Sequence, residues 1–329
     1  MGIRSFAYLT DRYIIVATHV SPPNELQPNL LVFDLTIGPF SRGELEHSLY
    51  ICSFLCPSPG PWTVALDIEI QSDPPPSYMP DPALSVPFFT DRQNRLFVVT
   101  IKLTNGFFIE TFVIFIPSST LTEYIATLSC HDMRRCVPWE AWGPKGTRMV
   151  PSPGHSSVWV CYVYGMRFVA PHGGRGTGTT IHVYDFNPLS IKRAVAAGCE
   201  PNGNTTYVTT TTSLDTSGKF EDVVTTSLPF CMSRLSVETT AAVDGDNLGA
   251  VMCSEDNLII VGVRGFKSAF FLPLVCLSLC SLILLDGFWQ STIPNTHVLR
   301  LATMTRRYIH RFAGPSSLHW ERMHSLDSS

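Results

Sequence analysis

Prolines and glycines interrupt this sequence so often that long helices have little room to form. The 329 residues include 25 prolines and 22 glycines. Between these breaks lie short runs rich in β-branched and aromatic residues, which favour strands. The sequence therefore predicts an all-β protein of short strands. The clearest runs are Tyr13–Ala17, Leu30–Leu35, Val64–Ile70, Leu96–Leu103, Phe107–Ile116, Val158–Val169, Ile181–Phe186, Ala250–Cys253 and Leu258–Val263.

The pattern within two of these runs predicts how they are buried. Val64–Ile70 alternates with a period of two, which is typical of a half-buried strand. We expect Asp67 and Glu69 on one face and the apolar residues on the other, namely Val64, Leu66, Ile68 and Ile70. Val158–Val169 has no polar alternation, so it is predicted to be one fully buried strand.

Neighbouring runs are predicted to pair as antiparallel strands. Thr104-Asn105-Gly106 separates Leu96–Leu103 from Phe107–Ile116, and Asn-Gly favours the positive φ of a tight hairpin turn. Val158–Val169 is expected to pair with Ile181–Phe186, which Asn187-Pro188 would end because proline lacks the N–H that a ladder needs. Ala250–Cys253 is expected to pair with Leu258–Val263.

Two of these strands end in the same way, at Val32-Phe33-Asp34-Leu35 and at Val183-Tyr184-Asp185-Phe186. An aromatic residue, an aspartate and an apolar residue also end the blades of WD-type propellers, although no strict repeat period is present here. Strand pairs about every 40 residues fit a propeller better than a sandwich. We therefore predict a degenerate β-propeller-like array of antiparallel strands, which is incomplete or irregular.

One segment interrupts this pattern. Ser268–Leu285 is eighteen residues without a charge, between Lys267 and Asp286. Its length just reaches that of a minimal membrane span. Three interpretations remain open: translated intron sequence, ordinary buried strands, or a membrane helix. The predicted organisation is a propeller-like recognition domain at 1–264, an apolar insert at 265–290, and a last strand with a basic tail at 291–329.

Charge and cysteine content narrow the class of protein. The net charge is 23 − 27 = −4, so nucleic acid is not an expected partner. There are ten cysteines, and several lie in apolar runs, including Cys161, Cys253, Cys276 and Cys280. Buried cysteine behaves as a small hydrophobe, so we expect reduced thiols and a cytoplasmic or nuclear protein.

Several groups were weighed as sites of chemistry, and none amounts to a catalytic, cofactor or metal signature. The glycine-rich stretch His172–Thr180 lacks the lysine and the helix of a phosphate-binding loop. The group Cys130-His131-Asp132 with Cys136 does not define a zinc site. Adding Cys52 and Cys56 as a second pair of ligands does not make the pattern specific. The carboxylates Asp67, Glu69 and Asp185 do not define an acid–base pair. Trp139, Trp142 and Trp159 are expected to pack rather than to stack on a ligand, with Glu140 pairing with Lys145 or Arg148.

Three consecutive segments carry a family resemblance. A tryptophan- and proline-rich segment, Val137–Arg148, is expected to be a loop; it is followed by VWVCYVYGMRFV (Val158–Val169) and IHVYDFNPL (Ile181–Leu189). This order resembles the C-terminal region of the F-box proteins of mushroom-forming fungi. The residues that carry the resemblance, for which a structural role is expected, are Pro138, Trp139, Glu140, Trp142, Gly143, Pro144, Gly146, Thr147, Arg148, Cys161, Tyr162, Val163, Tyr164, Gly165, Arg167, Phe168, Asp185, Phe186, Asn187 and Pro188.

The resemblance implies a protein-recognition domain that selects substrates for a ubiquitin ligase. In such proteins an N-terminal F-box binds the adaptor of a cullin–RING ligase. No F-box is visible here, so we expect this chain to be the truncated recognition half, which would bind the adaptor only with an F-box upstream. A stand-alone or membrane-attached scaffold and a propeller glycosidase are the alternatives. The protein partner itself is unknown; the segments expected to contact it are Pro74–Pro82, His172–Thr180 and Asn202–Lys219, the last a threonine-rich mobile loop or phosphorylation site.

Overall fold

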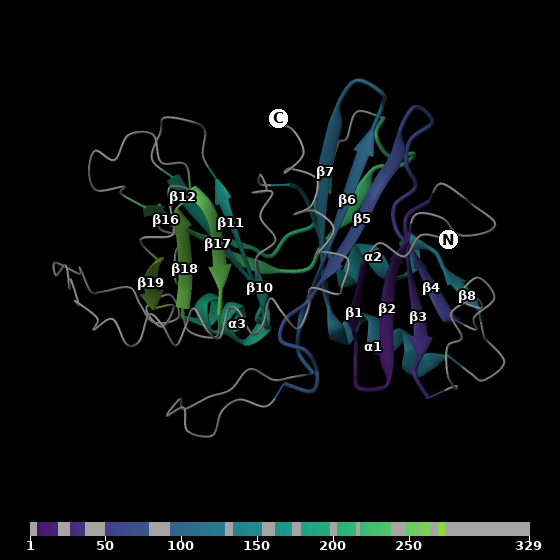
Figure 1. The fold of residues 1–329 in the computed structure, drawn as a ribbon, viewed down its shortest axis with the longest axis horizontal. Coiled ribbons are helices and arrows are strands. Elements are labelled where there is room, and N and C mark those ends of the chain that lie inside the picture. The colour runs from purple at the N-terminus through teal and green to yellow at the C-terminus, as the bar shows by residue number, and fades with distance from the viewer. Residues whose placement is uncertain are drawn as a thin grey trace, which may run out of the picture. The chain divides into compact units, whose positions relative to one another are not determined.

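The strands of this chain form several separate sheets rather than one. The computed structural model describes residues 5–18, 27–36, 50–78, 93–128, 134–152, 162–172, 179–197, 203–214, 218–237, 248–254, 257–262 and 269–273. All of them belong to one compact unit, Met1–Leu279. They form five sheets and three helices, and almost every strand pair is antiparallel (Figure 1). The prediction of an all-β array of antiparallel strands is confirmed.

The first sheet is a meander to which one later strand is added. Its order is β1 (Ser5–Tyr8), β2 (Tyr13–Thr18), β3 (Asn29–Asp34), β4 (Tyr50–Leu55) and β8 (Arg135–Val137). The predicted pairing of Tyr13–Ala17 with Leu30–Leu35 is confirmed by β2 and β3. β8 lies parallel to β4, although about 80 residues separate them in the chain.

The second sheet contains the longest hairpin. Its order is β5 (Val64–Gln71), β6 (Leu96–Thr104), β7 (Ile109–Pro117) and β9 (Arg148–Pro151). The predicted Asn-Gly hairpin is confirmed, and Gly106 has the positive φ, +88°, that such a turn requires. However, β7 begins at Ile109, so Phe107 and Phe108 belong to the turn rather than to the strand.

A bulge in β5 changes the predicted burial of that strand. The register shifts between Ala65 and Asp67, so one more residue lies on β5 than on β6. As a result Val64 and Leu66 are 44% and 42% exposed, whereas Ala65 and Ile68 are buried. The prediction that Val64 and Leu66 face the core with Ile68 and Ile70 is therefore wrong, because alternation holds only as far as the bulge.

The third sheet contains the later part of the resemblance. Its order is β10 (Val163–Tyr164), β11 (Arg167–His172), β12 (Thr179–Asp185), β16 (Phe230–Val237) and β13 (Thr205–Val208). The predicted single strand over Val158–Val169 is wrong in its described part, because Gly165 has φ +58° and turns the chain between β10 and β11. The predicted pairing of this run with Ile181–Phe186 is confirmed by β11 and β12.

Two smaller sheets complete the described strands. β17 (Leu248–Cys253), β18 (Asn257–Gly262) and β19 (Ala269–Pro273) form one, which confirms the predicted pairing of Ala250–Cys253 with Leu258–Val263. β19 occupies the beginning of the apolar segment Ser268–Leu285, whose residues 274–285 lie outside the described residues. β14 (Thr212–Leu214) and β15 (Val224–Thr226) form the other.

Consecutive sheets contact one another through their early strands. β1 lies against β5, β10 against β6, and both β10 and β11 against β17. Apolar side chains also pack between the second and third sheets, such as Phe115 of β7 against Phe168 of β11, with ring centroids 5.0 Å apart. Among the described residues this array does not close into a ring.

Three short helices lie between strands. They are α1 (Ser118–Thr127), α2 (Trp139–Gly146) and α3 (Pro188–Ala196). In Figure 1, α1 and α2 lie beside the first sheet, and their Leu121, Ile125 and Trp142 join its core. α2 occupies most of Val137–Arg148, so the prediction of a loop there is wrong. α3 begins just after β12, and its N-cap Asn187 accepts a hydrogen bond from the backbone N–H of Leu189.

The threonine-rich stretch Asn202–Lys219 also differs from its prediction. It contains β13 and β14, so half of its described part is paired strand rather than a mobile loop. Just beyond it the chain returns to the start of the second sheet. The backbone N–H of Gly60 donates to the carbonyl oxygen of Lys219 at 2.8 Å, and that of Glu221 donates to Ser58 at 3.0 Å. Phe220 and Val224 thus share one core with residues near the start of the chain, such as Ala7.

Candidate functional site

Two glycines allow the helix of the first resemblance segment to pack closely. A Cβ on Gly143 would lie 2.4 Å from the ring of Trp139, and one on Gly146 would lie 2.3 Å from the side chain of Thr120. Both approaches are closer than any side chain permits, so packing selects glycine at these two positions. Pro138 precedes the helix with extended φ and ψ, and Thr147 ends it, its hydroxyl donating to the carbonyl oxygen of Gly143 at 2.7 Å.

The two tryptophans of α2 are structural. Trp142 is 2% exposed, and its ring lies edge-on to Trp139 and to Phe54 of β4 at 5.1 and 5.4 Å between centroids. Its indole N–H donates to the carbonyl oxygen of Leu55 at 3.0 Å. A buried tryptophan needs such an acceptor, and this one fixes α2 on the first sheet. Trp159 lies outside the described residues.

Arg148 is a buried cation held by neutral oxygens. It is 1% exposed, and its guanidinium donates to the backbone carbonyls of Thr210, Thr226 and Leu228 and to the hydroxyl of Thr212. Burial lowers its pKa. The predicted pairing of Arg148 with Glu140 is therefore wrong: β9 uses this side chain to hold the strands β14 and β15.

The remaining resemblance residues mainly support the third sheet. Cys161 lies outside the described residues, Tyr162, Val163 and Phe168 are buried in the core, and Tyr164 is partly buried beside it. Asp185 accepts a hydrogen bond from the backbone N–H of Asn187 at 2.8 Å and lies 3.7 Å from Arg167. Phe186 packs with Phe115, their centroids 4.7 Å apart, and Pro188 begins α3.

The two similar strand endings adopt the same local structure with different electrostatics. At the end of β3, Asp34 accepts from the backbone N–H of Thr36 and from two nitrogens of Arg12. Those bonds lower the pKa of Asp34 to about 2. At the end of β12, burial raises the pKa of Asp185, because Arg167 is more distant there. Both aspartates close a turn, so neither is available as an acid or base.

The proline-rich stretch begins beside a buried arginine. Arg95 is 1% exposed and donates to the backbone carbonyls of Tyr8, Leu9 and Pro74. Asp73 lies near Arg95, and burial of its carboxyl group raises its pKa to about 6. Residues 79–82 of Pro74–Pro82 and 173–178 of His172–Thr180 lie outside the described residues. The predicted contact role of these segments stays a prediction.

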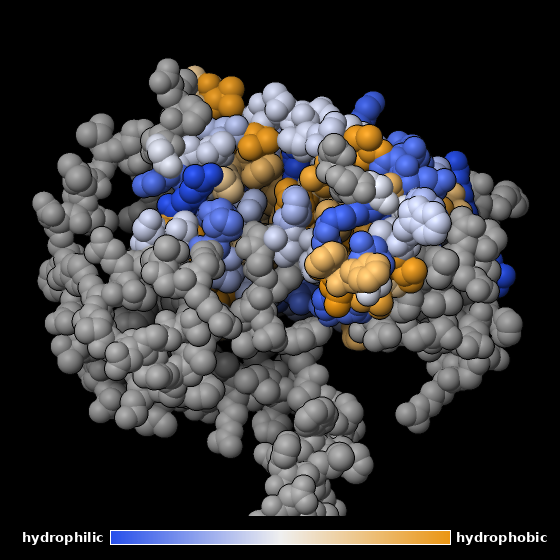
Figure 2. All heavy atoms as spheres, turned by 90° about the horizontal axis from the view of Figure 1, so that it is seen from above, coloured by the Kyte–Doolittle hydropathy of each residue, from blue (hydrophilic) through white to orange (hydrophobic). Residues whose placement is uncertain are grey.

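A group of exposed apolar side chains lies at the end of the second sheet where the β6–β7 hairpin turns. Trp62 is 84% exposed, Phe107 88%, Phe108 71% and Ile109 64%. Val64, Thr104 and Ile109 stand opposite one another in β5, β6 and β7, so they share a face of the sheet. We call the six exposed apolar residues here the aromatic tip: Trp62, Val64, Leu66, Phe107, Phe108 and Ile109. In Figure 2, which views the molecule from the side where this hairpin turns, orange residues lie among blue ones.

Hydrogen bonds hold the aromatic tip in one conformation. The side-chain oxygen of Asn105 accepts from the backbone N–H groups of both Phe107 and Phe108, at 3.1 and 3.0 Å. The hydroxyl of Thr104 donates to the carbonyl oxygen of Phe108. At the turn beside Trp62, a Cβ on Gly60 would lie 2.0 Å from the carbonyl oxygen of Gly218, so only glycine allows this approach. The aromatic rings therefore project from an ordered turn.

Charges near the aromatic tip neutralise one another. Lys102 pairs with Asp67 and Glu69 at 3.0 and 3.4 Å, and Lys219 pairs with Glu110. Two of the three carboxylates that were weighed as acid–base candidates are thus bound to the same lysine. Sequence analysis did not identify this surface. Its only sequence signals are Trp62 directly after Gly60-Pro61 and the two phenylalanines directly after Asn105-Gly106.

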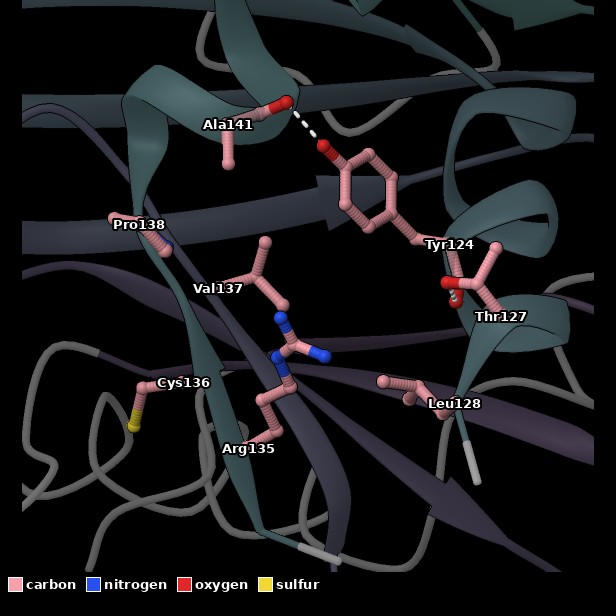
Figure 3. A pocket seen from close by; sticks show the side chains of 8 residues that line it. All are labelled: Tyr124, Thr127, Leu128, Arg135, Cys136, Val137, Pro138 and Ala141. Atoms are coloured by element: carbon pink, nitrogen blue, oxygen red, sulfur yellow. Dashed lines mark hydrogen bonds between the residues drawn. The ribbon is translucent and has the colours of Figure 1, made fainter. Parts of the chain in front are cut away.

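A pocket beside the resemblance helix is too small for a substrate. It has a volume of about 100 Å³ and is lined by Tyr124, Thr127, Leu128, Arg135, Cys136, Val137, Pro138 and Ala141. Figure 3 shows the Arg135 guanidinium between Val137 and Leu128, while the Tyr124 hydroxyl donates to the carbonyl oxygen of Ala141. Pockets that bind small molecules measure about 300–1,000 Å³. This one is a packing gap between α1, α2 and β8.

The cysteines in the described residues are free thiols, and they do not gather as metal ligands. Burial raises the pKa of Cys52 and of Cys56 to about 12, so both stay protonated. Among the described residues, no group of three or more histidine, cysteine or acidic side chains could hold a metal ion. Cys130, His131 and Asp132 of the weighed zinc site lie outside this part of the chain.

Comparisons with known proteins give no relative. No protein-family model matches the chain, and neither a curated protein nor a solved structure is similar to it. In the part of the chain that the structure describes, no helix combines the length and the apolar character needed to cross a membrane.

Proposed function

We propose that this chain is a protein-recognition domain and that the aromatic tip is its contact surface. The observation that carries the proposal is the exposure of Trp62, Phe107 and Phe108 at one end of one sheet. Exposed aromatic residues that cluster at a rigid position are typical of binding hot spots. Because hydrogen bonds already order the turn, binding costs little further conformational entropy.

A protein partner fits this surface better than a membrane. Interfacial membrane binding of soluble domains combines apolar insertion with attraction of lysine and arginine to anionic lipids. At the aromatic tip both described lysines are bound to carboxylates, so the part of this surface that the structure describes carries no excess positive charge. An apolar centre with a neutralised polar rim is the usual composition of a protein–protein interface.

The sequence resemblance supports a finer proposal, which is that this domain selects substrates for an F-box-type ubiquitin ligase. Successive antiparallel sheets that pack against one another are a suitable scaffold for recognition, because rigid strands hold exposed turns in place. The alternative is a scaffold without a ubiquitin connection. Recovery of a cullin–RING adaptor with the full-length gene product would favour the ligase role, and its absence would favour the scaffold.

The test compares two sets of exposed apolar residues. One variant carries Trp62→Ser, Phe107→Ser and Phe108→Ser; its matched control carries Leu189→Ser and Val195→Ser on α3, which are 60% and 59% exposed. We expect quantitative crosslinking in cells to recover a protein with the wild type and the control, but not with the tip variant. Binding of the purified wild type to neutral or anionic vesicles, lost in the tip variant, would overturn the protein proposal. Equal recovery by all three forms would also overturn it.

A further inference from the structure

One face of the third sheet gathers positive groups at the end away from its core. His172 of β11 lies diagonal to His182 of β12, and their rings stack with centroids 4.5 Å apart and an angle of 16° between planes. Arg234 of β16 stands directly opposite His182. Thr180 lies two positions before His182 in β12, and Ser236 lies two positions after Arg234 in β16. Their hydroxyls therefore belong to the same face of the sheet.

These groups have no acidic partner in the described part of the sheet. Arg234 is exposed and forms no ion pair with a described carboxylate. Asp185, the carboxylate of β12, lies at the other end of the strand and pairs with Arg167. The remaining titratable group near His182 on this face is Tyr184, whose ring lies 6.3 Å away and whose pKa burial raises, so it stays neutral. Arg234 therefore carries a positive charge that no described carboxylate compensates, and each histidine adds to it when protonated.

We propose that His172, His182 and Arg234 form a binding site for a phosphate-like oxyanion. Imidazolium and guanidinium groups donate charge-assisted hydrogen bonds, and the two hydroxyls add neutral donors suited to the other oxygens. Such an anion would offset the repulsion between Arg234 and the protonated forms of the two histidines. A metal ion fits less well, because Arg234 would repel it.

The electrostatics of His182 agree with this assignment. Its side chain is 8% exposed, and its pKa is lowered first by burial and then by the charges of His172 and Arg234. An anion bound between these groups must raise that pKa, because it favours the charged imidazole. Conversely, anion affinity must fall as the pH rises and the imidazole loses its proton.

The test follows the histidine ring resonances by NMR while sulfate or inorganic phosphate is added to the whole chain at constant ionic strength. Sulfate keeps its charge from about pH 5.5 to 8, so any pH dependence comes from the protein. We expect saturable shifts of His172 and His182, and a higher pKa of His182 at saturating sulfate. Arg234→Gln, an exposed position, should weaken binding about tenfold or more, since it removes a charged donor. His182→Gln should act likewise, and Arg193→Gln on α3 is the matched control.

Three outcomes would overturn the proposal. These are shifts that do not saturate, an unchanged pKa of His182 at high sulfate, or equal weakening by Arg193→Gln. Saturable binding of zinc or nickel to the same imidazoles without anion binding would assign a metal site instead. A phosphoserine peptide and its unphosphorylated form then identify the source of the anion. Tighter binding of the phosphopeptide than of inorganic phosphate indicates a phosphorylated protein, and equal binding indicates a free phosphate compound.

Discussion

Helix α2 and the aromatic tip are built from the same kinds of residue and have opposite environments. Both combine proline and glycine with large aromatic rings, as in Pro138-Trp139 and Pro61-Trp62. Trp142 is 2% exposed, whereas Trp62 is 84% exposed. The difference lies in what surrounds each segment: α2 is covered by β4, α1 and the strands held by Arg148, while the tip ends a hairpin. Aromatic composition alone therefore does not separate core from contact surface.

The largest expected effect concerns Arg148, whose four acceptors join β9 to a distant segment. Arg148→Ala leaves several buried carbonyl oxygens without a donor and removes a filled volume. We expect a loss of about 3–5 kcal/mol in the free energy of unfolding. Urea denaturation followed by tryptophan fluorescence measures it. Arg193→Ala on the exposed face of α3 is the control, and a loss as small as the control's would contradict the structural role of this residue.

Gly143 tests whether the packing of α2 is as close as its geometry indicates. In an exposed helix, Gly→Ala stabilises, but here the added Cβ would lie 2.4 Å from the Trp139 ring. We expect Gly143→Ala to reduce stability by about 1–3 kcal/mol, the usual cost of overpacking. Gly203→Ala is the matched control, since nothing lies within 4 Å of its added Cβ. Equal stability of the two variants would show that α2 is loosely packed.

Asp73 extends the comparison to a third proline-bearing segment. The folded carboxyl group binds its proton more tightly than the unfolded one does, because its pKa is raised from 3.8 to about 6. Stability is therefore greatest below the unfolded pKa and falls as the pH rises to about 6. We expect Asp73→Asn to stabilise the protein by about 1–2 kcal/mol at pH 7.5 and by little at pH 4. Thermal unfolding at both values measures this, and a gain independent of pH would mean that Asp73 is solvated like a surface carboxylate.

The smallest expected effect on stability belongs to the aromatic tip. Replacing Trp62, Phe107 and Phe108 by serine removes side chains that are mostly in water, so the free energy of unfolding should change by less than about 0.5 kcal/mol per residue. Loss of partner binding with preserved stability would sharpen the contrast with α2. A large loss of stability would instead show that the tip is part of the core.

Local patterns in the sequence predicted four of the strand pairs. The β2–β3, β6–β7, β11–β12 and β17–β18 pairs follow from apolar runs and turn residues that act over a few positions. The failures have nonlocal or competing causes. Gly143, Pro144 and Gly146 oppose helix formation, and α2 forms because tertiary packing outweighs propensity. The bulge in β5 and the turn at Gly165 each shift a register that alternation alone cannot reveal.

The candidate surfaces were less predictable than the strands. The exposure of Phe107 and Phe108 depends on where β7 begins, which is uncertain by one or two residues from sequence. The cluster of His172, His182 and Arg234 depends on the pairing of β12 with β16, across more than forty intervening residues. The segments that carry the family resemblance contain both buried residues, such as Trp142 and Arg148, and exposed ones, such as Pro138 and Glu140, so their expected structural role stays a prediction.

The acceptors of Arg148 also affect how the chain is made. They lie at residues 210–228, so about 80 residues must be synthesised after Arg148 before its guanidinium can be enclosed. At about 5–20 residues per second this takes roughly 4–16 s. Until then, β9 exposes a charged side chain where the finished protein has a core. During translation the first two sheets therefore remain an incomplete intermediate, open to chaperones and proteases until β14 and β15 have been synthesised.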